Sequence, residues 1–143
     1  MRNDPGQLAA ELTLALLLLA VAGLLLSRML RALPGGGGVA ESKKTPAIAA
    51  HVRAAQAAGQ PRVLTRASGA RQRANRRAAC GHWPQGSPLS CDEYPFASTH
   101  QGGRGASTAG VPKVEQRRQG GELRAFYAKA KVKVGDQFLV VVR

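Results

Sequence analysis

The chain has 143 residues, and its 21 Lys and Arg against eight Asp and Glu give a net charge of +13. After an apolar N-terminal segment about 110 residues remain, which suits one small domain. A charge this positive predicts a polyanionic partner, either nucleic acid or an anionic membrane surface, and the plain alternative is a solvated basic face.

The N-terminal segment is typical of a signal peptide or an uncleaved membrane anchor. Residues 12–26 read LTLALLLLAVAGLLL and carry no charge. A buried core helix is a third option, but a helix that is apolar on all faces does not suit so small a domain. Basic residues after the run favour a cytoplasmic C-terminal side, whereas a disulfide would favour export. We expect residues 1–33 to direct export or anchoring, with membrane attachment through residues 8–30, and a secreted or membrane-anchored protein.

Residues 34–44 form a glycine-rich linker, and the first predicted elements of the domain, residues 45–143, follow it. Thr45 and Pro46 are helix start signals, and Gly59 ends that helix. A short strand is predicted over residues 62–65. Ser68 then starts an arginine-rich helix that runs to about residue 80, whose charges suit contact with a phosphate backbone better than packing.

The second half of the chain predicts one long irregular segment, a helix and a strand. Residues 81–110 are rich in Gly and Pro, which makes long regular elements improbable there. A helix is predicted from about Val114, with Gly120 and Gly121 marking either a break or a close backbone approach. Residues 131–142 begin with alternating polar and apolar side chains, turn near residue 135 and end as a buried strand. These elements predict a mixed α+β fold.

Acidic residues are scarce beyond the apolar run, where the chain holds only Glu41, Asp92, Glu93, Glu115, Glu122 and Asp136. Acids at a nucleic-acid-binding face repel the ligand, so they persist there only where a metal ion or a proton transfer requires them. Asp92, Glu93 and Glu115 are therefore candidate catalytic or metal-binding groups. Glu115 and Gln119 share one helix face and could bracket a cation. In the alternative, Asp92 caps a short helix, and Glu115 either acts as a cap or pairs with Arg118 or Gln119 on a solvated face.

Two cysteines, Cys80 and Cys91, lie in the soluble part of the chain. A bridge between them would close a short loop, would stabilise the fold by about 3 kcal/mol, and would form only in an oxidising compartment. The alternatives are two free thiols, or a zinc site with His82 and His100, although the spacing fits no standard zinc pattern. The histidines are expected to be structural or exposed. The sequence shows no Ser-His-Asp spacing, phosphate loop or GxGxxG pattern.

Several motifs occur together in one order: RRAAC, CDEYPFAST, a Gly-Gly pair, VPKVEQ, QGGELRAFY and VGDQFLV. In this order and spacing they resemble the NucA/NucB family of bacterial secreted deoxyribonucleases, and particularly its actinobacterial members, over residues 59–142. The resemblance implies a small α+β nuclease with a ββα-metal type active site. It also implies a divalent cation, Mg²⁺ or Mn²⁺, and endonucleolytic cleavage of DNA with little sequence preference.

Carried over motif by motif, the resemblance assigns roles to individual residues. Asp92 matches the general base, and Glu93 is its catalytic or orienting neighbour. Glu115 matches a metal ligand, with Gln116 and Gln119 as further candidates. We expect DNA to be held by Arg66, Arg71, Arg73, Arg76, Arg77 and Arg104.

The chain departs from the family pattern at two positions. Gln101 precedes the Gly-Gly pair where an acid is usual, and Gln116 replaces Asn, which would weaken activity if either residue touches the metal. The sequence therefore predicts an exported, monomeric, metal-dependent DNA endonuclease, with an immunity or inhibitor protein as a further expected partner. The alternative is a non-catalytic, membrane-attached, basic DNA-binding protein.

Overall fold

The computed structural model describes residues 40–41 and 44–142, and the expected signal peptide or anchor lies outside these residues. In chain order the described elements are β1 (Ala40–Glu41), α2 (Pro46–Ala57), β2 (Val63–Thr65), α3 (Gly69–Cys80), β3 (Leu89–Tyr94), β4 (Ser107–Pro112), α4 (Lys113–Lys129), β5 (Gln137–Leu139) and β6 (Val141–Val142). None of the described helices combines the length and the apolar character needed to span a bilayer.

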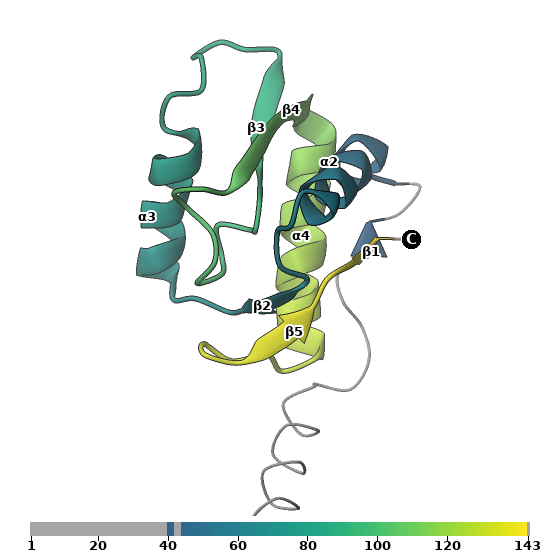
Figure 1. The fold of residues 1–143 in the computed structure, drawn as a ribbon, viewed down its shortest axis with the longest axis vertical. Coiled ribbons are helices and arrows are strands. Elements are labelled where there is room, and N and C mark those ends of the chain that lie inside the picture. Colours follow the sequence, from purple (N-terminus) through teal and green to yellow (C-terminus); the bar gives the residue numbers. More distant parts are fainter. Residues whose placement is uncertain (1–39, 42–43, 143) are drawn as a thin grey trace, which may run out of the picture. The chain divides into compact units, whose positions relative to one another are not determined.

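The strands form three small two-stranded sheets, which confirms the α+β class. β3 and β4 pair antiparallel in register from Leu89 opposite Pro112 to Tyr94 opposite Ser107. β2 pairs antiparallel with β5, and β1 pairs parallel with β6. Figure 1 shows the β3–β4 hairpin between α3 on one side and α4 with α2 on the other. The hairpin is therefore the element on which all three helices converge.

The predicted helix starts are confirmed, because the signals that set them are local. Pro46 is the first residue of α2, and the Ser68 side chain caps α3 by accepting a hydrogen bond from the Arg71 amide at 3.3 Å. In α4, Leu123 and Tyr127 are buried. Gly120 does not break that helix, which continues to Lys129.

The expectation that residues 81–110 lack long regular elements was wrong, because β3 and the first four of the six residues of β4 lie there. The prolines and glycines of this segment stand mostly before β3 and between the two strands, so residues 89–94 contain neither. The turn predicted near residue 135 is confirmed, and strand structure follows it from Gln137. The final strand is divided into β5 and β6, and Leu139 is exposed rather than buried.

The core lies between α2, α4 and the strands, and aromatic rings fill its centre. Tyr94 and Phe96 pack edge to face with ring centroids 5.2 Å apart, and Tyr127 and Phe138 do so at 5.4 Å. The buried Tyr94 hydroxyl donates a hydrogen bond to the Pro61 carbonyl at 2.8 Å. Because Tyr94 directly follows the Asp-Glu pair on β3, the same packing fixes the position of those acids.

Candidate active site

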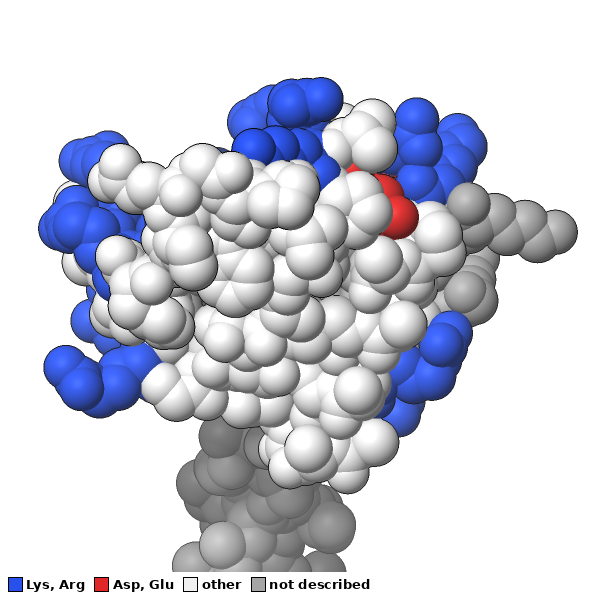
Figure 2. All heavy atoms as spheres, turned by 90° about the horizontal axis from the view of Figure 1, so that it is seen from above, with Lys and Arg blue, Asp and Glu red and all other residues white. Residues whose placement is uncertain are grey.

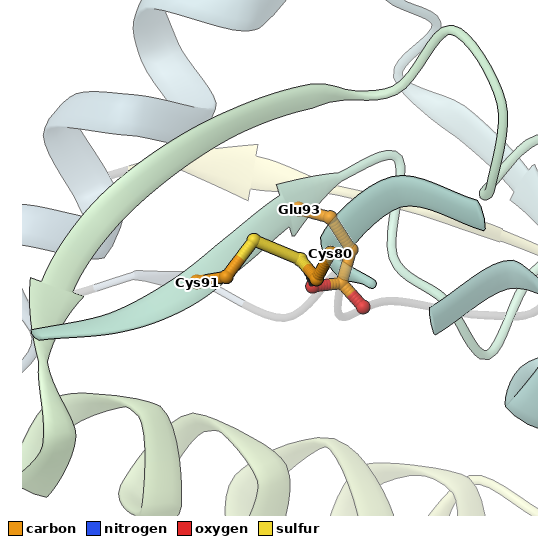
Figure 3. A group of neighbouring side chains, drawn as sticks. All are labelled: Cys80, Cys91 and Glu93. Carbon is orange, nitrogen blue, oxygen red and sulfur yellow. Dashed lines mark hydrogen bonds between the residues drawn. A yellow bond between two sulfur atoms is a disulfide. The ribbon is translucent and has the colours of Figure 1, made fainter. Parts of the chain in front are cut away.

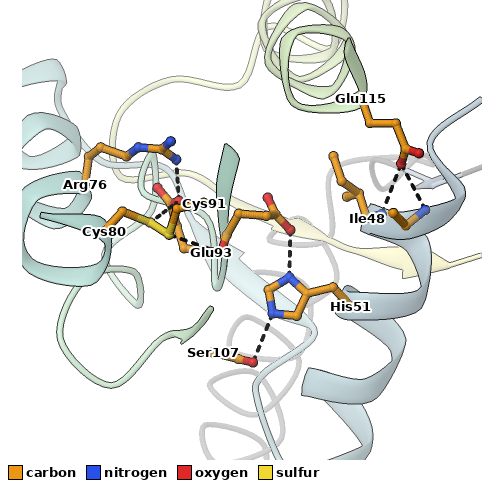
Figure 4. A network of polar contacts seen from close by, with 10 residues as sticks. Ile48, His51, Arg76, Cys80, Cys91, Glu93, Ser107 and Glu115 are labelled. Atoms are coloured by element: carbon orange, nitrogen blue, oxygen red, sulfur yellow. Dashed lines mark hydrogen bonds and ion pairs between the residues drawn. A yellow bond between two sulfur atoms is a disulfide. The ribbon is translucent and has the colours of Figure 1, made fainter. Parts of the chain in front are cut away.

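Asp92 and Glu93 are both buried in the centre of β3, with 1% and 3% of their surfaces exposed. Successive strand residues point to opposite sides, and the two carboxylates accordingly turn to different helices. Asp92 faces His51 of α2, and Glu93 faces Arg76 of α3 (Figure 4). The alternative that Asp92 caps a helix is therefore excluded.

The Asp92 carboxylate is held by a chain of polar contacts that the sequence analysis did not find. Its Oδ2 lies 2.7 Å from His51 Nδ1, and His51 Nε2 lies 3.0 Å from Ser107 Oγ (Figure 4). A carboxylate only accepts hydrogen bonds, so His51 Nδ1 carries a proton, and in the neutral ring Nε2 accepts from the serine hydroxyl. His51 thus fixes the direction in which Asp92 points.

One signal in the sequence could have identified His51. With Ile48, Val52 and Ala55 it forms an i, i+3, i+4, i+7 stripe, and all four residues are buried. A histidine in the middle of an apolar stripe requires a buried polar partner. That partner lies 41 residues further along the chain, so the sequence does not name it.

Glu93 lies between an arginine and a disulfide. Its Oε2 accepts a hydrogen bond from Arg76 Nη1 and lies 3.2 Å from Cys80 Sγ. Burial raises the pKa of Glu93 to about 7, although the neighbouring Arg76 charge opposes this shift. Glu93 therefore exchanges its proton near neutral pH.

Cys80 and Cys91 form a disulfide that ties the end of α3 to β3 (Figure 3). Their sulfur atoms and a Glu93 carboxylate oxygen lie within 4.8 Å of one another. While the two sulfurs are bonded to each other, neither is a thiolate, so this cluster is not a metal site in the oxidised protein. His82 and His100 are both exposed and are not part of the cluster.

Glu115 occupies a different place from the other predicted site residues. It lies in the first turn of α4, and its Oε2 accepts hydrogen bonds from the backbone amides of Ala47 at 2.9 Å and Ile48 at 3.2 Å (Figure 4). These amides begin α2, and the Thr45 side chain makes no cap hydrogen bond to them. Glu115 therefore caps α2, the helix that carries His51.

A cleft of about 650 Å³ brings most of the predicted site residues together. Its lining includes two acids, two amides and three cations: Asp92, Glu93, Gln116, Gln119, Arg73, Arg76 and Arg77. Gln116 Oε1 and Gln119 Nε2 are buried, and the described part of the chain offers neither atom a hydrogen-bond partner. Since amide oxygen and nitrogen are interchangeable by a rotation, both side chains can present an oxygen to a ligand in the cleft.

The remaining predicted residues do not line this cleft. Arg66 lies over the Tyr127 ring at 4.5 Å and donates to the Val132 carbonyl, so it packs rather than facing a ligand. Arg71 and Arg104 are exposed outside the cleft. Gln101 Oε1 accepts a hydrogen bond from the Thr65 amide at 3.0 Å, so its departure from the family pattern leaves the cleft unchanged.

Burial of three acids leaves the charged groups on the surface mostly basic. Asp92, Glu93 and Glu115 are all buried, whereas most Lys and Arg side chains are exposed. In Figure 2 most of the visible face is white, with blue Lys and Arg groups along its edges and one small red area. The cleft therefore combines exposed arginines, which suit contact with a polyanion, with two buried carboxylates.

The family follows from comparison with known proteins. The family model Deoxyribonuclease NucA/NucB matches residues 50–141, and the chain belongs to this family. The protein is therefore a deoxyribonuclease and its substrate is DNA. No curated protein matches the chain. The matched span includes His51, Asp92, both cysteines, Gln116 and Gln119.

Proposed function

We propose that the protein is an exported or membrane-anchored, metal-dependent endonuclease that cuts DNA largely without regard to sequence. One observation carries this proposal: Asp92 shares an arginine-lined cleft with two amide side chains that have buried, unpartnered polar atoms. Buried polar groups normally have partners, and an orphaned pair in a cleft indicates a bound ligand.

The arginines account for binding and for the lack of sequence preference. Arg73 and Arg77 are exposed on α3 and line the cleft, where they can contact phosphate oxygens. Such contacts give affinity and position the strand, but they carry no sequence information. Arg76 is already paired with Glu93, so it contributes less free positive charge than its neighbours.

Asp92 is the general base of the proposed reaction. Its Oδ2 is held by His51, which leaves Oδ1 to take a proton from the attacking water. Because the imidazole fixes the plane of the carboxylate, the accepting oxygen needs little reorientation at the moment of reaction. The arginines at the cleft stabilise the negative charge that develops on the phosphate.

The side chains of the cleft fit a divalent cation. Gln116 and Gln119 would hold it through amide oxygens, and hard oxygen donors suit Mg²⁺ or Mn²⁺. Such a cation polarises the phosphate and stabilises the leaving oxygen. The carboxylate of Glu115, engaged with the start of α2, acts on the site through His51.

The export part of the proposal rests on the disulfide and on the apolar N-terminal sequence. Disulfides persist in oxidising compartments and are rare in the cytosol. Residues 12–26 have the composition of a signal-peptide core or an anchor. A protein of this kind is toxic to its own cell while it is active inside, which is why we also propose an inhibitor protein or a redox restraint.

A plasmid-nicking assay on the full-length chain tests the activity. We expect supercoiled plasmid to be relaxed in Mg²⁺ or Mn²⁺, to stay intact in EDTA, and to stay intact with Asp92→Asn in either metal. Cleavage in EDTA, or by the Asp92→Asn protein, would contradict the proposal. Plasmid that binds but is cut in neither metal would identify a non-catalytic DNA-binding protein instead.

A further inference from the structure

A second cleft, of about 490 Å³, adjoins the first and is not used by the proposed mechanism. It shares Arg76, Arg77 and Gln116 with the catalytic cleft, so the two are continuous. The rest of its lining comes from the end of α3, the loop before β3, the start of β3 and the first turn of α4. A DNA strand that leaves the catalytic cleft along this side would enter it directly.

The second cleft is lined by cations and by no acid among the described residues. Arg77, Lys113 and Arg117 line it and are all exposed, and Arg76 adds a fourth positive side chain. Three exposed cations along one groove match the phosphates of a nucleic acid backbone better than a neutral ligand.

Trp83 is the aromatic component of this cleft. Its Nε1 donates to the Leu89 carbonyl at 3.3 Å, which holds the ring beside the start of β3. A Cβ atom on Gly110 would lie 3.1 Å from Trp83 Cζ2, so the ring rests directly on the β4 backbone. A larger residue at position 110 would displace the indole or the Leu89 side chain, whose Cδ1 would lie 2.9 Å from the added Cβ. The ring is therefore fixed on one side and lines the cleft with the rest of its surface.

We infer that the second cleft is a nucleotide subsite for single-stranded DNA next to the scissile phosphate. Trp83 stacks on a base, and Arg77, Lys113 and Arg117 hold the adjoining phosphates. A duplex keeps its base faces covered by their neighbours, whereas a single strand offers them to an indole. The subsite rests on the proposed function only for its position beside the cut, because binding itself needs neither metal nor Asp92.

The protein offers a direct reporter, because Trp83 is the one tryptophan of the chain. The experiment titrates the full-length Asp92→Asn protein in EDTA with a dodecamer of thymidine nucleotides, a blunt duplex of equal length, and inorganic phosphate. We expect saturable quenching of the indole fluorescence by the single strand, about tenfold tighter than by the duplex, because stacking contributes roughly 1–3 kcal/mol per base. Inorganic phosphate should not reproduce the quenching.

Variants separate the indole from the charges, with binding followed by the anisotropy of a labelled oligonucleotide. Trp83→Leu should weaken single-strand binding about tenfold, and Trp83→Phe should restore part of the loss because it keeps an aromatic face. Lys113→Ala should lower the salt dependence of binding by about 0.7 in the slope of log K against log salt. Lys133→Ala removes an equal charge outside both clefts and should change neither quantity.

Three results would overturn the subsite: equal affinity for duplex and single strand, unchanged binding by Trp83→Leu, or equal quenching by phosphate alone. None of them depends on catalysis, since all titrations are made in EDTA. Failure of the plasmid assay would overturn the proposed endonuclease activity and would leave the binding result standing.

Discussion

Asp92 Oδ2 lies 2.7 Å from His51 Nδ1, and this contact joins the centre of β3 to the middle of α2. Ser107 continues the contact on the other side of the ring, at 3.0 Å. The order Ser-His-Asp is that of a hydrolase triad, but neither His51 nor Ser107 lines either cleft. We therefore propose that His51 and Ser107 orient the Asp92 carboxylate and that the serine does not act as a nucleophile toward DNA.

The first prediction concerns His51 as a positioning residue. His51→Ala should lower the rate of plasmid cleavage by about 10- to 100-fold, the usual effect of losing a group that orients a ligand or base. Ser107→Ala should have a smaller effect, since Ser107 contacts the ring and not the carboxylate. His51→Asn, which can still donate one hydrogen bond, should recover part of the activity.

Thermal unfolding separates positioning from folding in these variants. His51 is buried, so His51→Ala also lowers the melting temperature, whereas Ser107→Ala should leave it nearly unchanged. If Ser107→Ala abolished cleavage while the protein stayed folded and bound DNA, the serine would be a reacting group and the positioning role would be wrong.

The second prediction concerns Glu115, which contacts the amides of Ala47 and Ile48 at 2.9 and 3.2 Å. Glu115→Gln should destabilise the fold by about 1–2 kcal/mol in denaturant unfolding, the range found for loss of a helix cap. The metal concentration that gives half-maximal cleavage should stay unchanged. A shift of tenfold or more in that concentration, with stability unaffected, would show that Glu115 is a metal ligand as the family resemblance implies.

The contrast between Glu115 and Asp92 shows what the sequence could and could not predict. The motifs place both acids in the site, and the chemistry of the Asp-Glu pair is evident from its rarity in a basic chain. The contacts of Glu115 are backbone amides 67 and 68 residues away, and no side-chain pattern announces them. For the same reason, the sequence shows His51 as a polar residue in an apolar stripe but does not identify Asp92 as its partner.

In the fold as well, elements set by neighbouring residues were predictable and elements set by distant contacts were not. The starts of α2 and α3 depend on Pro46 and Ser68, within one turn of the helix, and both were predictable. β3 was not, because its stability comes from pairing with β4, packing against three helices and the bridge to α3. Composition alone predicts an irregular segment over residues 81–110.

The third prediction is a pH dependence that arises from Glu93. Its pKa is about 7 in the folded protein, against an ordinary value of 4.5, so the folded state keeps a proton that the unfolded chain has lost. The stability contributed by this proton is fully present below about pH 4.5 and is lost as the pH rises to 7. Relative to that of Glu93→Gln, the free energy of unfolding of the wild type should fall by about 3 kcal/mol across that interval.

Denaturant unfolding of both proteins at pH 4.5, 6 and 7.5 measures this difference. Arg76→Ala removes the charge that lowers the pKa of Glu93, so it should move the upper end of the interval above pH 7. Parallel stability curves for the wild type and Glu93→Gln would show that Glu93 does not hold its proton in the folded state.

The fourth prediction concerns the disulfide between Cys80 and Cys91, which holds α3 against β3 beside Asp92 and Glu93. Replacing both cysteines by serine should destabilise the fold by about 3 kcal/mol in the chain-entropy model and should lower the cleavage rate. Reduction of the wild type with a phosphine, which avoids the metal binding of thiol reductants, should have the same effect. The double variant is the control and should not respond to the phosphine. Equal wild-type activity before and after reduction would rule out a redox restraint.

The fifth prediction concerns Gln116, whose Oε1 is buried with no partner among the described residues. If this oxygen serves a cation, Gln116→Leu should raise the metal concentration for half-maximal cleavage about tenfold. The same change removes an unsatisfied buried polar atom, so the melting temperature should hold or rise. Gln72 also lines the cleft but is exposed, and Gln72→Leu is therefore the matched control that should alter neither quantity. A lower melting temperature with an unchanged metal requirement would assign Gln116 to the fold.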